Sequence, residues 1–103
     1  MALQDRFSDA DDLVILTETL EETVDLGKGR DTLTIVAEIG VDNASIVGLE
    51  GQKDITVIAT TGQALLDATI QTGDGNDFVR LTAAAGAAMS GTASFIDVGN
   101  GDN

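Results

Sequence analysis

The sequence contains no cysteine, histidine, proline, tryptophan or tyrosine, and aromatic residues make up only 3% of it. Because it lacks cysteine, the chain has no disulfide scaffold and no thiol redox chemistry. Because it also lacks histidine, the usual residues for nucleophilic catalysis and transition-metal binding are missing. Compact globular cores draw on large side chains, so burial here must come from Val, Ile, Leu, Ala and Thr stacked as in a repeat protein.

Basic residues are scarce as well. Five Lys and Arg face 18 Asp and Glu, which gives a formal net charge of -13. A phosphate backbone would be repelled, so nucleic acid is not an expected partner. Such an acidic excess is typical of disordered chains, but 43% of the residues are hydrophobic and they alternate in order. The carboxylates repel one another, and a divalent cation or the positive charge of a partner would relieve that repulsion.

The sequence has no signal-peptide pattern in its first residues and no run with the pattern of a membrane span. Residues 1–7 have neither the basic region nor the apolar run of a signal peptide, and no apolar run is long enough to span a bilayer. We therefore expect no membrane insertion. The 103 residues form one domain at most. In it, the acidic residues 1–12 are expected to form an N-terminal capping arm and residues 13–103 the repeats.

A glycine-rich turn is the most informative stretch of the chain. Gly73 and Gly75 permit the positive φ angles of a tight arch, and Asp77 closes the turn with a carboxylate that can point into it. Val79 and Leu81 follow with the alternation of a strand that has one buried face. The segment thus predicts an arch that leads directly into a strand.

The turn recurs along the sequence. Five-residue turns begin at residues 8, 27, 49, 73 and 99, in steps of 19 to 26 residues, and apolar residues alternate on both sides of them. We predict an all-β fold, a parallel β-solenoid of about four coils with 19–26 residue repeats. It is either a flat β-roll or a three-sided β-helix, and coils of 22 to 26 residues favour the three-sided form. Residues 83–92 are nearly all Ala, Gly and Ser, and they form either a loop or a third strand.

The pattern at residues 73–80 resembles the Gly-x-Gly-x-Asp-x-apolar-x repeat of the RTX (haemolysin-type, calcium-binding) β-roll family. The resemblance implies calcium ions between the turns of successive coils, held by the motif aspartate and by carbonyls around the glycines. Calcium takes six to eight such oxygens at about 2.3–2.6 Å. Carried over to this sequence, the candidate metal-binding residues are Gly73, Gly75, Asp77, Gly99, Gly101 and Asp102. An amide, Asn103, stands where the last motif has its aspartate.

The earlier turns depart from the family pattern. Basic residues interrupt the turn at residues 27–31, and Lys53 takes the aspartate position in a column between Asp31 and Asp77. We interpret the ammonium group of Lys53 as a substitute for calcium in the first half of the chain. Any calcium is then expected only beside Asp77 and Asp102.

Other motifs are poorer matches. The turn at residues 73–77 lacks the ligand spacing and the final Glu of an EF-hand, and residues 27–29 lack the remainder of a phosphate-binding loop. Asp74 and Asp77 are poor candidates for a carboxylate pair in glycoside cleavage, because no aromatic platform for a sugar is present. We therefore expect no enzymatic activity.

The expected function is that of a structural repeat module of an extracellular or cell-surface adhesin, surface layer or filament. One alternative is a phage virion protein, as a capsid decoration or tail appendage. Another is an RTX-type secretion domain of an exported hydrolase, which the N-terminal Met disfavours. The repeats are expected to continue beyond residue 103 or to be capped by another chain, because an open last coil exposes unpaired backbone groups. Other protein chains, in a homo-oligomer or as stacked coils, are thus the expected partners.

Overall fold

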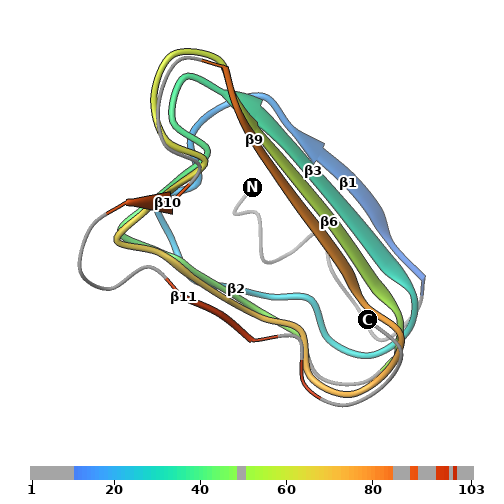
Figure 1. The fold of residues 1–103 in the computed structure, drawn as a ribbon. Coiled ribbons are helices and arrows are strands. Elements are labelled where there is room, and N and C mark those ends of the chain that lie inside the picture. The colour runs from blue at the N-terminus through green and yellow to red at the C-terminus, as the bar shows by residue number, and fades with distance from the viewer. Residues whose placement is uncertain (1–10, 49–50, 85–88, 91–94, 98, 100–103) are drawn as a thin grey trace.

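The computed structural model describes residues 11–48, 51–84, 89–90, 95–97 and 99. These residues form three parallel sheets and no helix (Figure 1). The long sheet has the order β1 (Leu13–Leu16), β3 (Asp31–Ala37), β6 (Lys53–Ala59) and β9 (Phe78–Ala83). The second sheet has the order β10 (Met89–Ser90), β7 (Leu65–Leu66) and β4 (Val41–Asp42). The third has the order β11 (Phe95–Asp97), β8 (Thr69–Gln71), β5 (Ser45–Val47) and β2 (Val24–Asp25).

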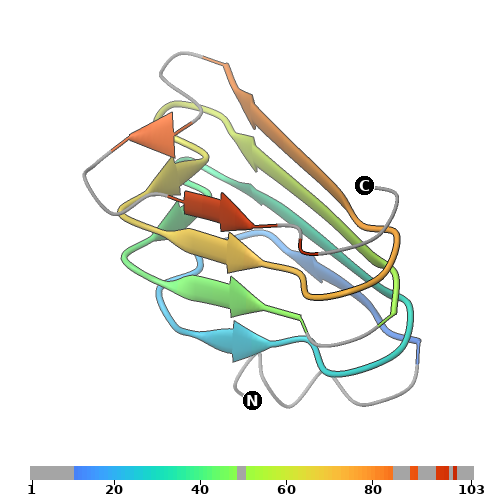
Figure 2. The ribbon, with the colours of Figure 1, turned by 60° about the horizontal axis from the view of Figure 1, so that its bottom comes forward.

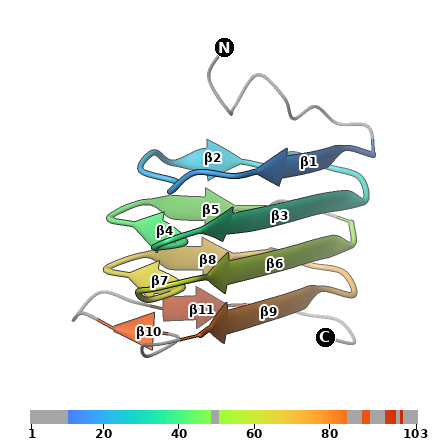
Figure 3. The ribbon, with the colours of Figure 1, turned by 90° about the horizontal axis from the view of Figure 1, so that it is seen from above.

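The chain winds around these three sheets in a fixed sequence. From β3 it passes to β4, then to β5, and returns to the long sheet as β6, one strand further along (Figures 2 and 3). The predicted fold class is confirmed: the protein is an all-β parallel solenoid of about three turns. About four coils were predicted from the turns in the sequence, but the four strands of the long sheet are separated by only three circuits.

The three sheets give each coil three sides, which is the form that the coil length favours. The segment rich in small residues supplies a strand to the second sheet at Met89–Ser90, paired with Leu65–Leu66. In the first coil Leu20 takes the corresponding place, through a single parallel bridge to Val41. The second sheet is therefore built from strands of only two residues and a single bridge. Such short pairings explain why the alternation of apolar residues alone does not reveal this sheet.

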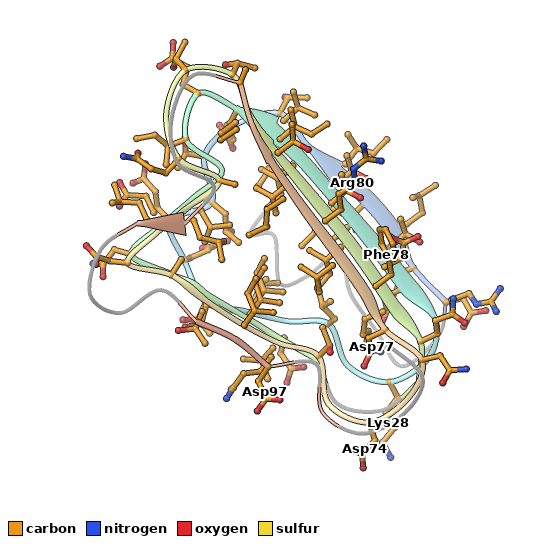
Figure 4. All side chains as sticks on the ribbon, in the orientation of Figure 1. Lys28, Asp74, Asp77, Phe78, Arg80 and Asp97 are labelled. Atoms are coloured by element: carbon orange, nitrogen blue, oxygen red, sulfur yellow. The ribbon has the colours of Figure 1, made fainter. Side chains whose placement is uncertain are left out.

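The register of the long sheet stacks similar side chains in columns. Leu33 pairs with Ile55, and Ile55 in turn pairs with Val79, so the inward-facing residues of three coils lie over one another. In β3 and β6 every second side chain is buried along the whole strand. Burying one aliphatic side chain of this size contributes about 1.5–3 kcal/mol, and these columns form the core. The outward-facing side chains include Phe78 and Arg80, which point away from the coil (Figure 4).

The corner between the second and third sheets is made by residues in the left-handed conformation. Asn43 and Asp67 have φ angles of 51° and 49°, and they occupy the same place in successive coils. Asn and Asp tolerate this region better than other residues with a side chain. The repeated corner keeps the coils in register without a glycine at that position.

Burial of the core columns differs between the middle and the C-terminal side of the solenoid. Ile55 and Val57 on β6 are fully buried, whereas Val79 and Leu81 on β9 are only partly buried. The next place in each column, beyond β9, is not filled by any described strand of the long sheet. The core residues of β9 are therefore partly exposed to solvent.

Candidate functional site: a buried charge column at the glycine turns

The glycine turns stack at the corner between the third sheet and the long sheet, where Lys28 and Asp74 lie at the outside and Asp77 at the inside (Figure 4). The turns that begin at Gly27 and Gly99 contain the same hydrogen bond. The N–H of Gly27 donates to Asp25 Oδ1 at 2.8 Å, and the N–H of Gly99 donates to Asp97 Oδ1 at 2.9 Å. Such aspartate turns fix a tight change of direction.

Glycine is required here by the stacking as well as by the backbone angles. Gly75 has a φ of 124°, and a Cβ atom on it would lie 2.5 Å from the carbonyl oxygen of Gly51 in the preceding coil. Gly51, with a φ of 93°, lies against Gly29 in the same manner. No other residue allows the turns to approach so closely.

Lys53 is the first residue of β6, and its side chain points into the solenoid. It pairs in register with Asp31, as the sequence predicts, and both side chains are 0% exposed. The ammonium Nζ donates to Asp31 Oδ2 at 2.9 Å and to the carbonyl oxygen of Gly29 at 2.6 Å. A buried charge is tolerated only when it is paired and hydrogen-bonded, and both conditions are met.

The two aspartates that flank Lys53 in the stack also bind backbone groups of the coil before them. Asp31 Oδ1 accepts the N–H of Asp12 at 3.1 Å, and Asp77 Oδ1 accepts the N–H of Lys53 at 2.9 Å. We call Asp31, Lys53 and Asp77 the charge column. Each member is therefore tied to the next by a hydrogen bond, which confirms the predicted stacking of these three residues.

At the arches of Asp77 and Lys53, the residue five positions earlier lies against the member of the charge column. Thr72 Oγ1 donates to Asp77 Oδ2 at 2.9 Å. Opposite Lys53 stands Gly48, where a Cβ atom would lie 3.0 Å from Lys53 Cε and 2.8 Å from the carbonyl oxygen of Thr72. The sequence pattern does not single out Thr72 or Gly48 as contacts of the charge column, because the residue types at these two positions differ.

Burial governs the electrostatics of Asp31. Removal from water raises the pKa of its carboxyl group, and the hydrogen bond and charge of Lys53 oppose this effect without cancelling it. The folded protein therefore binds a proton at Asp31 more readily than the unfolded chain does. The ammonium group is what makes the ionised carboxylate tolerable at neutral pH.

The candidate metal residues are only partly described. Gly73, Gly75 and Gly99 all have positive φ angles in the stacked turns, and Gly99 lies directly over the carbonyl of Gly73. Asp77 lies at the same corner, buried. Gly101 and Asp102 lie outside the described residues, so calcium binding beside Asp77 stays a prediction. Among the residues that the structure describes, no three or more Asp or Glu side chains are grouped closely enough to hold a metal ion.

At the earlier turn, the place between two coils is filled. The carboxylate of Asp31 and the carbonyl of Gly29 are oxygen donors of the kind that calcium takes, and they converge on the ammonium of Lys53. A metal ion does not fit here while Lys53 is in place.

Comparisons with protein-family models, with curated proteins and with solved structures find no match. Within the described part of the chain, no helix has the length and hydrophobicity needed to cross a membrane. The class of protein that the structure shows is a parallel β-solenoid.

Proposed function

We propose that the chain is a non-enzymatic structural module, an RTX-like β-solenoid that forms part of a larger extracellular or cell-surface assembly such as an adhesin, surface layer or filament. The observation that carries the proposal is the half-buried core at β9. Val79 and Leu81 continue columns that are fully buried one coil earlier, so a further coil on this side would complete them. Solenoids require such a neighbour or a cap, because each repeat buries its apolar side against the next.

The backbone of β9 supports a protein partner. The strand pairs with β6 on one side, and no described strand pairs with its other side. In β3 and β6 the inward-facing residues Asp31 and Lys53 direct their N–H groups toward the next coil. By the same geometry, inward-facing residues of β9 present N–H groups to the partner. A strand of a second chain or a further coil is the natural acceptor for them.

The buried charged groups favour a structural role over catalysis. Lys53 and Asp31 are engaged with each other, and Asp77 is engaged with Thr72 and the backbone of Lys53. These groups hold coils together and are withdrawn from solvent. Calcium beside Asp77, where the resemblance to RTX repeats places it, would act as a further stabiliser in this proposal.

Association of the purified chain tests the proposal, and two neighbouring alanines provide a matched pair of variants. Ala83 is partly buried against the core at the end of β9, whereas Ala84 is exposed. We expect the protein to self-associate in light-scattering measurements, Ala83→Glu to be monomeric with unchanged circular dichroism, and Ala84→Glu to associate normally. A wild-type chain that stays monomeric at its highest soluble concentration, with and without calcium, would contradict assembly through this end.

A further inference from the structure

Lys53 occupies a site built from convergent oxygen atoms. Its Nζ lies 2.6 Å from the carbonyl oxygen of Gly29 and 2.9 Å from Asp31 Oδ2, both supplied by the preceding turn. The oxygen atoms of a carboxylate and of a main-chain carbonyl accept hydrogen bonds from an ammonium group, and they are also the ligands that a hard metal cation prefers. The first property of the site is therefore a preference for positive charge, independent of which cation supplies it.

The coil around Lys53 is shaped to admit the lysine stem. Gly48 faces Lys53 across the arch, and a Cβ atom there would lie 3.2 Å from Lys53 Cγ and 3.0 Å from Cε. The side chain is 0% exposed along with that of Asp31. A surface ion pair needs no such space. The absence of a side chain at residue 48 indicates that the buried ammonium is accommodated by the fold.

The charge of the column depends on this one residue. With Lys53 in place, Asp31 and Asp77 contribute two formal negative charges and the ammonium one positive charge, which leaves a single negative charge. With an aspartate at residue 53, the same three positions would carry three negative charges in a buried stack. Like charges at such spacing do not ionise together unless a cation lies between them.

We propose that the ammonium of Lys53 is a built-in cation, which occupies a latent divalent-cation site between the turns at residues 27–31 and 49–53 and makes the folding of this part independent of metal. Replacing the ammonium by a carboxylate converts the corner into a calcium-binding site and makes folding depend on the ion. The site is distinct from the predicted calcium position beside Asp77. The proposal does not rest on the proposed assembly, which is tested by association and not by metal-linked stability.

The test is urea unfolding of the purified chain, followed by circular dichroism, in chelator and in millimolar calcium. We expect the wild-type protein to unfold cooperatively from a β-rich state in chelator. Lys53→Asp is expected to lose that state in chelator and to recover it with calcium, with a shift of the folding equilibrium of about a hundredfold when calcium reaches about 100 times its dissociation constant. Lys28→Asp makes the same charge change on an exposed turn residue, and its response to calcium should equal that of the wild type.

A wild-type chain that folds only when calcium is added overturns the proposal. So does a calcium response of K53D no larger than that of K28D. If K53D does not fold under any condition, Lys53→Asn is measured in its place, because it supplies an oxygen donor without a third negative charge. The absence of any additional calcium stabilisation in K53N then overturns the latent site.

Discussion

The substitution Lys53→Met measures directly how much the buried ammonium contributes to stability. Methionine keeps most of the apolar stem in the space left by Gly48 and removes only the charged group. Asp31 then loses its ion pair at 2.9 Å, and its carboxylate stays fully buried without a countercharge from residue 53. Removing one partner of a buried pair destabilises by about 3–5 kcal/mol, because the other charge is left in a medium of low polarity. Since small domains are stable by only about 5–15 kcal/mol, this is a large fraction of the total.

Urea unfolding at neutral pH is the assay. With a slope of about 1–3 kcal/mol per molar, the midpoint should fall by at least about 1 M in K53M. Lys28→Met removes an exposed lysine from the preceding turn and should change stability by no more than about 0.5 kcal/mol. The loss in K53M should shrink as the pH is lowered, because Asp31 can then become neutral by binding a proton. The double variant D31N/K53M should be more stable than K53M at neutral pH, since it buries no unpaired charge.

A loss below about 1 kcal/mol in K53M at neutral pH, the size typical of an exposed ion pair, would refute this reasoning. It would mean that the ammonium and the carboxylate are hydrated, as in a surface ion pair. An equal loss in K28M and K53M would lead to the same conclusion.

Three further predictions concern the same corner. Thr72→Val should destabilise by about 1.5–3 kcal/mol because Asp77 loses a hydroxyl donor at 2.9 Å, whereas Thr72→Ser should retain most of the stability in the same urea titration. Gly48→Ala should lower the melting temperature by an amount equivalent to about 1–3 kcal/mol, because the added methyl group overlaps the carbonyl of Thr72 and crowds Lys53. An unchanged melting temperature would show that the arch can accommodate a methyl group at residue 48. The raised pKa of Asp31 means that its contribution to stability is present at low pH and is lost as the pH rises through the folded-state pKa. The urea midpoint should therefore increase as the pH is lowered from neutral toward about 4, and Asp31→Asn should show a flatter profile over that range.

Much of the architecture could be predicted because the turns and the strands carry independent signals. Gly75 and its equivalents mark the arches, and alternation around residues such as Ile55 marks the buried face, so the two together fix the stacking. The pairing of Asp31 with Lys53 follows from that register alone. The second sheet could not be located in the same way, because a two-residue strand such as Leu65–Leu66 is too short to show a period.

The site was predictable in its charges but not in its contacts. The sequence shows that Lys53 takes the position that aspartate has in the turns before and after it, because a basic residue stands out between Asp31 and Asp77 in the aligned repeats. Its bond to the carbonyl of Gly29 depends on how closely two backbones approach, which no pattern of side chains reports. The space at Gly48 is a similar case, because a glycine one residue before a degenerate turn is indistinguishable from an ordinary loop glycine until the opposite side of the arch is seen.

In a solenoid with similar coils, a strand can pair with the wrong coil during folding, because a strand that skips one coil still packs against aliphatic side chains. In this chain such a slip would bring the acid at residue 31 against the acid at residue 77, with the only basic group of that stack displaced elsewhere. The aliphatic columns do not discriminate between these two strand pairings. The order of negative, positive and negative charges in the charge column does. The ammonium group of Lys53 therefore stabilises the native order of the coils relative to an order that skips one coil. A protein in which one coil is duplicated or deleted would need either a countercharge for each newly stacked acid or a neutral residue in its place to reach the same stability.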